Sequence, residues 1–217
     1  MRIAVLCSDA RHPVFGWLER WRARRAGTDD VALATQSAAL EGGDLLLLVS
    51  CHEILAPELR AKYRKVLVLH ASDVPEGRGW SPYIWQVLEG RNRIVVSLLE
   101  ARDAVDSGAV WAQRAIALEG HELLPEIEQK LFAAELDLMD FAVAHLDSAA
   151  PREQDAARTP TVYRRRTPED SRLDPTRSIA EQFDLLRVCD AERYPAFFEL
   201  RGCRYIVTVR KAEPPGA

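Results

Sequence analysis

The chain has 217 residues, 47% of them hydrophobic and 29% charged, and its formal net charge is −4. This composition supports one folded domain with a small appendage and excludes a disordered chain. A general nucleic-acid binder would be strongly basic, and no apolar run approaches the length that spans a membrane. The first residues are too soon charged for an export signal, so we expect a cytoplasmic protein. The cysteines have no metal-binding or CxxC spacing and are expected to be free thiols: Cys7, Cys51, Cys189 and Cys203.

Short apolar runs alternate with helical patterns along the first half of the chain. Such runs are typical of strands that are buried on both faces, as in parallel sheets. Strands are predicted at 2–7, 44–50, 66–70, 93–99 and 110–116. Helices are predicted between them at 13–24, 30–40, 57–63 and 80–88. The alternation favours an α/β fold with a Rossmann-like, mainly parallel sheet and flanking helices.

Residues 122–146 form the clearest predicted helix. Two apolar rows step by three and four residues along it, as one wide face of a helix requires. The rows consist of Leu124, Ile127, Leu131, Ala134, Leu138 and Phe141, and of Phe132, Leu136, Met139 and Val143. A face this wide has to be buried, so we expect the helix to pack on the sheet.

The last third of the chain changes in character. Residues 149–177 are rich in Ala, Pro and Arg and predict a locally basic linker. Ser178 and Glu181 have the spacing of a capping box, which would open a helix that buries Ile179. Residues 195–210 alternate about an Arg-Gly turn and predict a β-hairpin. The expected organisation is a main domain at 1–148, a linker at 149–177 and a small C-terminal helix-hairpin subdomain at 178–217.

A polar segment from His70 to Pro82 directly follows a predicted strand. The carboxyl ends of strands border the ligand crevice in open α/β sheets, so His70 would place its ring there. A second polar turn, Ala104 to Gly108, follows the next strand, and the sheet could bring Asp106 beside His70. Such a pair could take a proton from an attacking amine, and an imidazolium could stabilise a developing oxyanion.

Structural roles compete with these functional interpretations. A histidine at a strand end is more often a hydrogen-bonded structural residue, and the sequence around Asp106 favours a turn in any case. Cys51 and His52 are adjacent on a strand, where neighbouring side chains point to opposite faces, so a nucleophilic dyad between them is disfavoured. The triple arginine at 164–166 is expected to be solvated, although it could meet a phosphate.

The order of the motifs carries a resemblance to a known family. The stretch HASDVPEGRGWSP at 70–82 is followed by VDSG at 105–108. This resembles the superfamily of formyltransferases that use 10-formyltetrahydrofolate, in which a His-Pro-Ser motif, an Arg-Gly pair and an Asp-Ser-Gly or Asp-Thr-Gly turn follow one another. The resemblance covers most of residues 40–146, and residues 174–211 are similar to the appendage of small bacterial sugar N-formyltransferases. It implies the formyltransferase fold, 10-formyltetrahydrofolate as the formyl donor, no metal, and a small amine acceptor such as a nucleotide-linked amino sugar.

The same resemblance implies roles for particular residues. His70 and Asp106 would be the catalytic pair. The cofactor pocket would be lined by Cys51, His52, Ile54, Leu55, Ser72, Asp73 and Val74. The acceptor amine would be bordered by Arg78, Gly79, Trp80, Ser81 and Pro82. Val68 stands where the family has its catalytic Asn, so the formyl oxygen would need a partner from His70 itself, from backbone amides or from residues 50–52.

Two other functions stay open at this point. A methionyl-tRNA formyltransferase-like enzyme is disfavoured by the net negative charge and by a C-terminal piece too short for the full barrel of those enzymes. A catalytically impaired relative that binds folate or nucleotide is kept open by Val68. We expect no nucleic-acid or membrane partner. A homodimer is plausible, with the hairpin at 195–211 pairing across an interface or covering the sheet.

Overall fold

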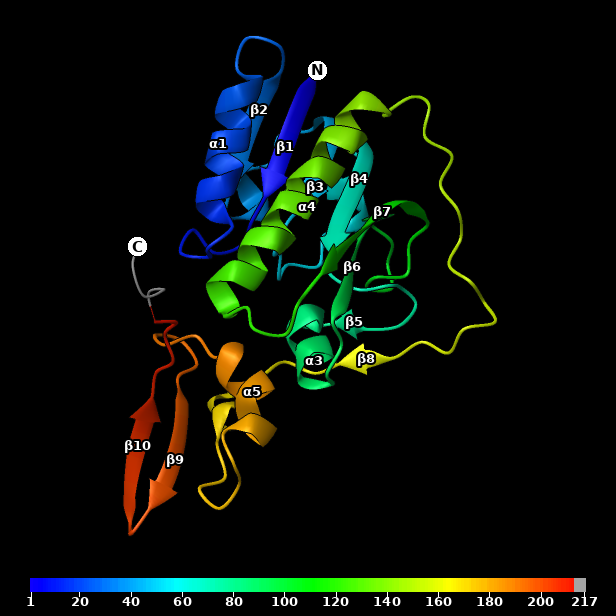
Figure 1. The fold of residues 1–217 in the computed structure, drawn as a ribbon. Helices are drawn as coiled ribbons and strands as arrows, with labels where there is room; N and C mark the ends of the chain where they lie inside the picture. The colour runs from blue at the N-terminus through cyan, green and yellow to red at the C-terminus, as the bar shows by residue number, and fades with distance from the viewer. Residues whose placement is uncertain (213–217) are drawn as a thin grey trace.

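The structure is a computed structural model that describes residues 1–212 (Figure 1). A six-stranded sheet with the strand order β2-β1-β3-β4-β6-β7 forms its centre. The strands are β1 (Arg2–Leu6), β2 (Asp30–Ala34), β3 (Gly43–Leu48), β4 (Tyr63–His70), β6 (Arg93–Glu100) and β7 (Val110–Ala117). The pairings among β2, β1, β3 and β4 are parallel, whereas β4–β6 and β6–β7 are antiparallel. The predicted α/β fold is confirmed, with a mixed sheet whose antiparallel pairs lie at one edge.

Helices lie on both faces of this sheet. The long helix α4 (Leu124–Ala144) and helix α1 (Phe15–Arg25) pack together on one face, over the larger apolar cluster (Figure 1). The single turn α2 (Pro57–Arg60) contacts β4 on the other face, where a smaller cluster lies. Helix α3 (Pro82–Leu88) follows the loop at the end of β4. Because β4 is covered on both sides, its carboxyl end is held rigidly where the loop at 71–81 begins.

Helix α4 confirms the prediction for residues 122–146. Both apolar rows are largely buried, from Leu124 at one end to Val143 at the other. Two carboxylates are buried in the same face, because Glu128 and Glu135 are only 7% and 5% exposed. Burying a charged side chain is costly unless it is partnered or neutral, so these two positions need a separate explanation.

The helix predicted at 30–40 is wrong. Residues Asp30–Ala34 form β2, which pairs in parallel with β1 at the edge of the sheet, and Ser37–Ala39 form only a 3₁₀ turn, η1. The segment DVALA alternates between more and less exposed side chains, which is the period of a half-covered edge strand. The helix predicted at 57–63 also ends early, because Tyr63 already belongs to β4 and is buried.

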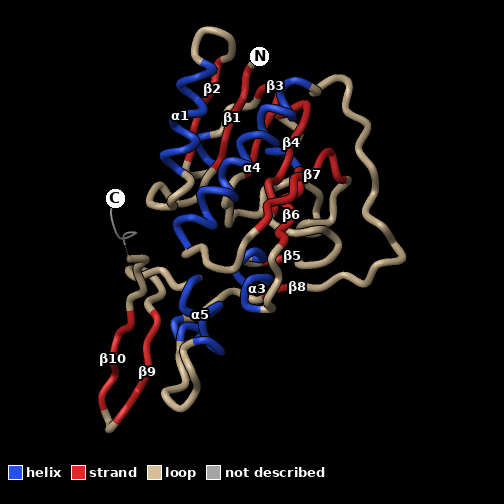
Figure 2. Tube along the Cα trace, viewed as in Figure 1, coloured by secondary structure: helices blue, strands red, loops and turns tan. Residues whose placement is uncertain are grey.

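Residues 145–161 run beside the sheet without helix or strand (Figure 2). The chain then forms β8 (Val162–Tyr163), which pairs in parallel with β5 (Arg78–Gly79) in the loop that follows β4. Earlier in this connection, Arg152 exchanges two backbone hydrogen bonds with Val110. The segment expected to be a linker is therefore attached to the main domain at several points, and the division of the chain at 148 and 177 stays a prediction.

The C-terminal part has the predicted order of helix and hairpin. The backbone N–H of Ser178 donates to the Glu181 carboxylate at 2.9 Å, as a capping box requires. The segment continues as η3 (Ala180–Gln182) and α5 (Phe183–Arg187), after a 3₁₀ turn η2 (Pro168–Ser171). Ile179 is 74% exposed rather than buried, and the small cluster here forms without it, around Leu173, Leu186 and Ala196.

The hairpin prediction is confirmed. Strands β9 (Ala196–Leu200) and β10 (Cys203–Val207) pair antiparallel, and the pair projects away from the sheet (Figure 1). Arg201 and Gly202 form the turn with φ of 52° and 79°, the positive values that a two-residue hairpin turn requires. Within residues 1–212, no helix is long and apolar enough to cross a membrane.

Candidate active site

A cavity of about 330 Å³ opens at the carboxyl ends of the central strands. Its walls come from the loops after β3, β4 and β6, and one end reaches helix α4 through Leu131, Phe132 and Glu135. The volume falls in the range of sites that hold small molecules. The edge where β3 and β4 end together is where the α/β arrangement predicts a ligand crevice.

His70, the last residue of β4, is buried and lines this cavity. Its Nε2 lies 2.9 Å from the carbonyl oxygen of Gly77, and its Nδ1 lies 3.5 Å from Oδ1 of Asp106. A carbonyl oxygen can only accept, so Nε2 must carry the proton of the neutral ring. Nδ1 then has the lone pair, on the side of the ring that faces Asp106. The structure therefore assigns Nδ1 as the nitrogen that can accept a proton.

Asp106 is held from both its side chain and its backbone. Its Oδ2 accepts a hydrogen bond from the backbone N–H of Gly79 at 2.9 Å, and Gln154 donates to its carbonyl oxygen at 2.7 Å. Asp106 itself has a φ of 52°, which a short polar side chain tolerates better than most. A Cβ at Gly108 would lie 1.7 Å from the carbonyl oxygen of Glu100, so the turn that presents Asp106 needs glycine there.

Many residues implied by the motif do line the cavity. From the expected cofactor set these are Cys51, His52, Ile54 and Leu55. From the expected acceptor set they are Gly79, Trp80, Ser81 and Pro82. The loops after β3 and β4 therefore bring the two groups to one space, together with His70 and Asp106.

Four other expected residues lie outside the cavity lining. Ser72 and Val74 are buried, and the carbonyl oxygen of Ser72 accepts a hydrogen bond from Ser97. The carboxylate of Asp73 accepts hydrogen bonds from Arg158 and Gln113. Arg78 directs its guanidinium to Oε1 of Gln154 at 2.6 Å. The side-chain hydrogen bonds of Asp73 and Arg78 hold the loop after β4 in place, and the backbone N–H of Ser72 donates to the carbonyl oxygen of His70 at 2.9 Å.

Val68 contributes an apolar side chain to the cavity wall. Val68 lines the cavity two residues before His70, next to the loop that contains Cys51. The hydroxyl of Ser8 donates to the Cys51 sulfur and accepts from the backbone N–H of His52. Burial raises the pKa of the Cys51 thiol, although hydrogen bonds from Ser8 and to Glu53 work in the other direction. Cys51 therefore stays a neutral thiol near pH 7 and is not a nucleophile.

Aromatic and cationic groups meet at the rim of the cavity. The rings of His52 and Trp80, which come from different loops, lie 5.0 Å apart between centroids. The guanidinium of Arg165 lies over the Trp80 ring at 5.0 Å, within the range of a cation–π contact. One arginine of the triple-arginine segment is therefore placed beside the cavity, where it can meet an anion.

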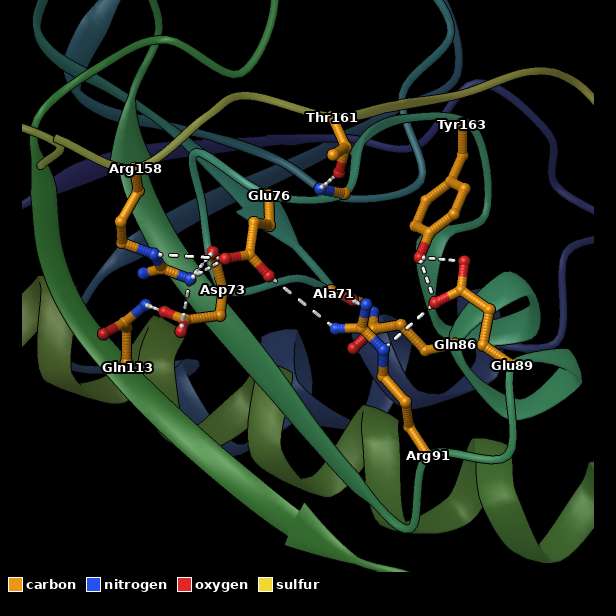
Figure 3. A network of polar contacts seen from close by, with 11 residues as sticks. Ala71, Asp73, Glu76, Gln86, Glu89, Arg91, Gln113, Arg158, Thr161 and Tyr163 are labelled. Carbon is orange, nitrogen blue, oxygen red and sulfur yellow. Dashed lines mark hydrogen bonds and ion pairs between the residues drawn. The ribbon is translucent and has the colours of Figure 1, made fainter. Parts of the chain in front are cut away.

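The connection at 149–163 holds the loop after β4 through Arg158 (Figure 3). Arg158 donates to the carbonyl and carboxylate oxygens of Asp73 and to Glu76. Despite burial, which works in the other direction, the hydrogen bond from Arg158 lowers the pKa of Asp73. Thr161 accepts a hydrogen bond from the backbone N–H of Gly77, the residue whose carbonyl accepts from His70. Residues 149–163 therefore hold the loop after β4, and that loop orients the His70 ring through Gly77. We call residues 149–163 the strap.

Sequence reasoning missed Arg158, His12 and Glu135. The strap was expected to be a linker, and nothing in its composition marks Arg158 out. His12 and Glu135 line the cavity from the β1–α1 loop and from α4. A signal existed for Glu135, because it lies between Leu131 and Leu138 on a helix face where only it and Glu128 interrupt the apolar residues.

Comparisons with known proteins agree with this geometry. A methionyl-tRNA formyltransferase from Clostridium thermocellum superposes with a TM-score of 0.81 at 20% identity, covering 100% of this chain and 95% of the other. A sugar N-formyltransferase from Shewanella sp. gives 0.72 at 14%, covering 99% of each chain. HypX from Aquifex aeolicus, solved with tetrahydrofolic acid, gives 0.77 at 19% and covers 96% of this chain and 37% of its own. Residues 1–143 match the formyl transferase family, and the chain is an enzyme that belongs to it.

Proposed function

We propose that this enzyme transfers a formyl group from 10-formyltetrahydrofolate to the primary amine of a small acceptor, a nucleotide-linked amino sugar. The observation that carries the proposal is the pair of His70 and Asp106, which faces one cavity from two loops with the proton-accepting nitrogen toward the carboxylate. The family membership supports the reaction, because its members use formyltetrahydrofolate.

The cavity has features that suit the formyl donor. Leu48, Leu55 and Val68 supply an apolar wall, and Ile54 is 80% exposed beside it. An exposed isoleucine next to an apolar wall offers a surface for a flat ring system. The donor, once bound, supplies an electrophilic formyl carbon. We propose that residues 51–55 hold its ring. Ser72, Asp73 and Val74 lie outside the cavity lining, and the Asp73 carboxylate already accepts hydrogen bonds from Arg158 and Gln113.

The chemistry at the pair follows from the hydrogen bonds. As the acceptor amine attacks the formyl carbon, Nδ1 of His70 accepts a proton from the amine nitrogen. Gly77 keeps the opposite nitrogen protonated, and Asp106 stabilises the imidazolium that results. The new N–H can then donate to the formyl oxygen, where negative charge develops. In this way His70 supplies the hydrogen-bond donor to the formyl oxygen that the apolar side chain of Val68 cannot supply.

The rim supports an anionic acceptor that carries a sugar. Trp80 presents an aromatic ring at the cavity, and Arg165 adds a positive charge beside it. A sugar can pack on an aromatic ring, and a guanidinium binds phosphate well. The similarity to a sugar N-formyltransferase over 99% of the chain supports the same class of acceptor.

A direct assay tests the proposed function. The enzyme is incubated with 10-formyltetrahydrofolate and a panel of UDP-, dTDP- and GDP-linked amino sugars, and mass spectrometry follows the gain of a formyl group. We expect one class of amino sugar to be formylated. Tight binding of the donor with no transfer to any amine would favour the impaired relative that Val68 keeps open.

A tRNA-directed activity is the second candidate, because the methionyl-tRNA formyltransferase is covered over 95% of its chain. Because the two chains match over nearly their full lengths, the length of the C-terminal piece no longer disfavours a tRNA substrate. The net negative charge of the chain still does, because binding to a phosphate backbone needs a basic surface. A salt-dependent gel shift with initiator methionyl-tRNA, followed by formylation of that tRNA, would favour this candidate over an amino sugar.

We also propose that the enzyme is a homodimer, joined through the hairpin β9–β10. Leu200, Tyr205 and Ile206 are each at least 46% exposed on this hairpin, which projects from the rest of the molecule. Light scattering of the purified protein tests this, and a mass of one chain at micromolar concentration would contradict it.

A further inference from the structure

Glu135 is a buried carboxyl that points into the cavity from helix α4. It is 5% exposed and lines the cavity together with Leu131 and Phe132. Its Oε2 is buried and has no hydrogen-bond partner among residues 1–212. Buried polar atoms are nearly always hydrogen-bonded, and an unsatisfied one typically costs about 1–3 kcal/mol. The carboxyl that carries this oxygen lines the cavity, so a ligand group that donates to the carboxyl would supply a partner that the protein does not.

The groups around Glu135 do not neutralise it. On its own helix, Glu128 accepts a hydrogen bond from the Tyr83 hydroxyl at 3.1 Å and adds negative charge. Cys7, directly after β1, stays a neutral thiol, because burial raises its pKa to about 11. Burial, with the charges of Arg193 and His52, lowers the pKa of His12 to about 4, so His12 is also neutral. Arg193 lies near His12, Glu128 and Tyr83, and its own hydrogen bond goes to Asp190.

The protonation state of Glu135 follows from these surroundings. Burial raises the pKa of Glu135 to about 8, and the charge of Glu128 adds to the effect. The free enzyme therefore holds a neutral carboxylic acid at this position near pH 7. A cationic ligand would reverse the balance, because an opposite charge in a buried site favours the carboxylate.

We propose that Glu135 binds the protonated primary amine of the acceptor and takes its proton before formyl transfer. The inference rests on the proposed function, since it concerns the same acceptor in the same cavity. It specifies the acceptor further, as a primary ammonium ion that enters at the α4 end of the cavity. His70 then removes the second proton, the one that becomes acidic as the C–N bond forms.

The protons balance in this scheme. Binding of the ammonium ion to Glu135 releases the carboxyl proton to solvent and leaves an ion pair of carboxylate and ammonium. Transfer of one proton from nitrogen to the carboxylate gives the free amine, whose lone pair forms the bond to the formyl carbon. The bond between that carbon and N10 of the donor breaks, and N10 receives the proton that His70 has taken. Glu135 keeps the first proton and is ready for the next acceptor.

Infrared spectroscopy tests the inference without any formyl transfer. A protonated carboxyl has a C=O stretch that disappears when the group ionises, so Glu135 can be followed directly in the free enzyme at pH 7. Ethylammonium chloride serves as the probe, and tetramethylammonium chloride, a cation without N–H donors, controls for charge and ionic strength. Because the raised pKa keeps Glu135 protonated in the free enzyme at pH 7, saturating probe should release up to one proton per site.

Two variants assign the signal. Glu135→Gln keeps the shape of the side chain and should lose both the infrared band and the proton release. Glu128→Gln makes the same replacement on the same helix, outside the cavity lining, and should keep both. Because glutamine replaces a carboxyl without a partner, we expect Glu135→Gln to fold, and circular dichroism checks this.

Each outcome decides the inference. The ammonium site is supported if ethylammonium abolishes the infrared band and tetramethylammonium does not. This should hold for the wild type and Glu128→Gln, whereas Glu135→Gln should have no such band. A band that ethylammonium leaves unchanged, or an equal response to both cations, overturns it. If the probe ionises Glu135 but no amine is ever formylated, the proposed function fails and the site stands. If amino sugars are formylated but Glu135 does not respond to the probe, the ammonium site fails and the proposed function stands.

Discussion

The two ends of the cavity differ in how their polar groups are satisfied. At the end formed by β4 and the turn at 104–108, His70 and Asp106 are held by backbone partners at Gly77 and Gly79. At the end formed by α4, Glu135 has a buried oxygen with no hydrogen-bond partner in the described part of the chain, residues 1–212. The difference teaches that one cavity can contain both a prearranged pair and a group that waits for its ligand. The prearranged pair lowers the cost of reaching the transition state, whereas the waiting group gives selectivity for a cation.

The largest expected effect is at the prearranged end. His70→Ala and Asp106→Ala should each lower the rate of formyl transfer on the order of a hundredfold or more, because a proton acceptor or its partner is lost. The measurement is kcat for the formylated amine found in the acceptor screen, with circular dichroism to confirm folding. Wild-type turnover in either variant would remove that residue from the mechanism.

The next effect is on stability at the α4 end. An acid whose pKa is raised to about 8 in the folded state stays protonated while the unfolded chain, with a pKa near 4.5, has ionised. Stability is therefore lost as pH rises from about 4.5 to 8, by on the order of 2–4 kcal/mol from this group. Glu135→Gln should lack this loss. Urea unfolding of wild type and variant at pH 5 and pH 8 measures the difference, and parallel changes in both proteins would contradict the expectation.

Glu122, just before α4, should show the opposite dependence on pH. Burial works against its ionisation, but hydrogen bonds from Lys130 and the Glu119 backbone lower its pKa to about 2. Its stabilising contribution is present above the unfolded pKa near 4.5 and is lost as pH falls toward 2. Glu122→Gln should lower the free energy of unfolding by roughly 1–2 kcal/mol at pH 7 and by less at pH 3. An equal cost at both values would show that the charge is not involved.

The smallest effect concerns the strap. Arg158→Ala should lower kcat about fivefold to tenfold, because the loop that presents Gly77 to His70 loses its main attachment. The acceptor KM should change less than kcat. Glu153→Gln is the matched control, since it breaks an exposed ion pair between the same connection and Arg102. Equal losses in the two variants would indicate a general effect of loosening the connection rather than positioning of the ring.

The central strands, the long helix and the hairpin could be predicted because their signals are local. Apolar runs, a three-and-four repeat and an Arg-Gly turn each lie within a few residues. The edge strand at 30–34 could not be predicted from the sequence. Its alternation of more and less exposed side chains spans only five residues and lies among residues with a helical pattern. His70 and Asp106 could be proposed as a pair because His70 ends one strong strand and the turn with Asp106 follows the next. Arg158 could not, since its partners Asp73 and Glu76 are more than 80 residues away in the chain.

By itself, the sequence determined the α/β class, the long buried helix and the loop motifs that resemble a formyltransferase. These follow from periodicity and from motif order, which need no knowledge of distant contacts. Only the tertiary structure decided which nitrogen of His70 can accept a proton, since that depends on a carbonyl seven residues along the loop. It also decided that the supposed linker is a strap and that Glu135 faces the cavity. Both depend on how segments far apart in the chain pack, and on the partners that packing leaves or withholds.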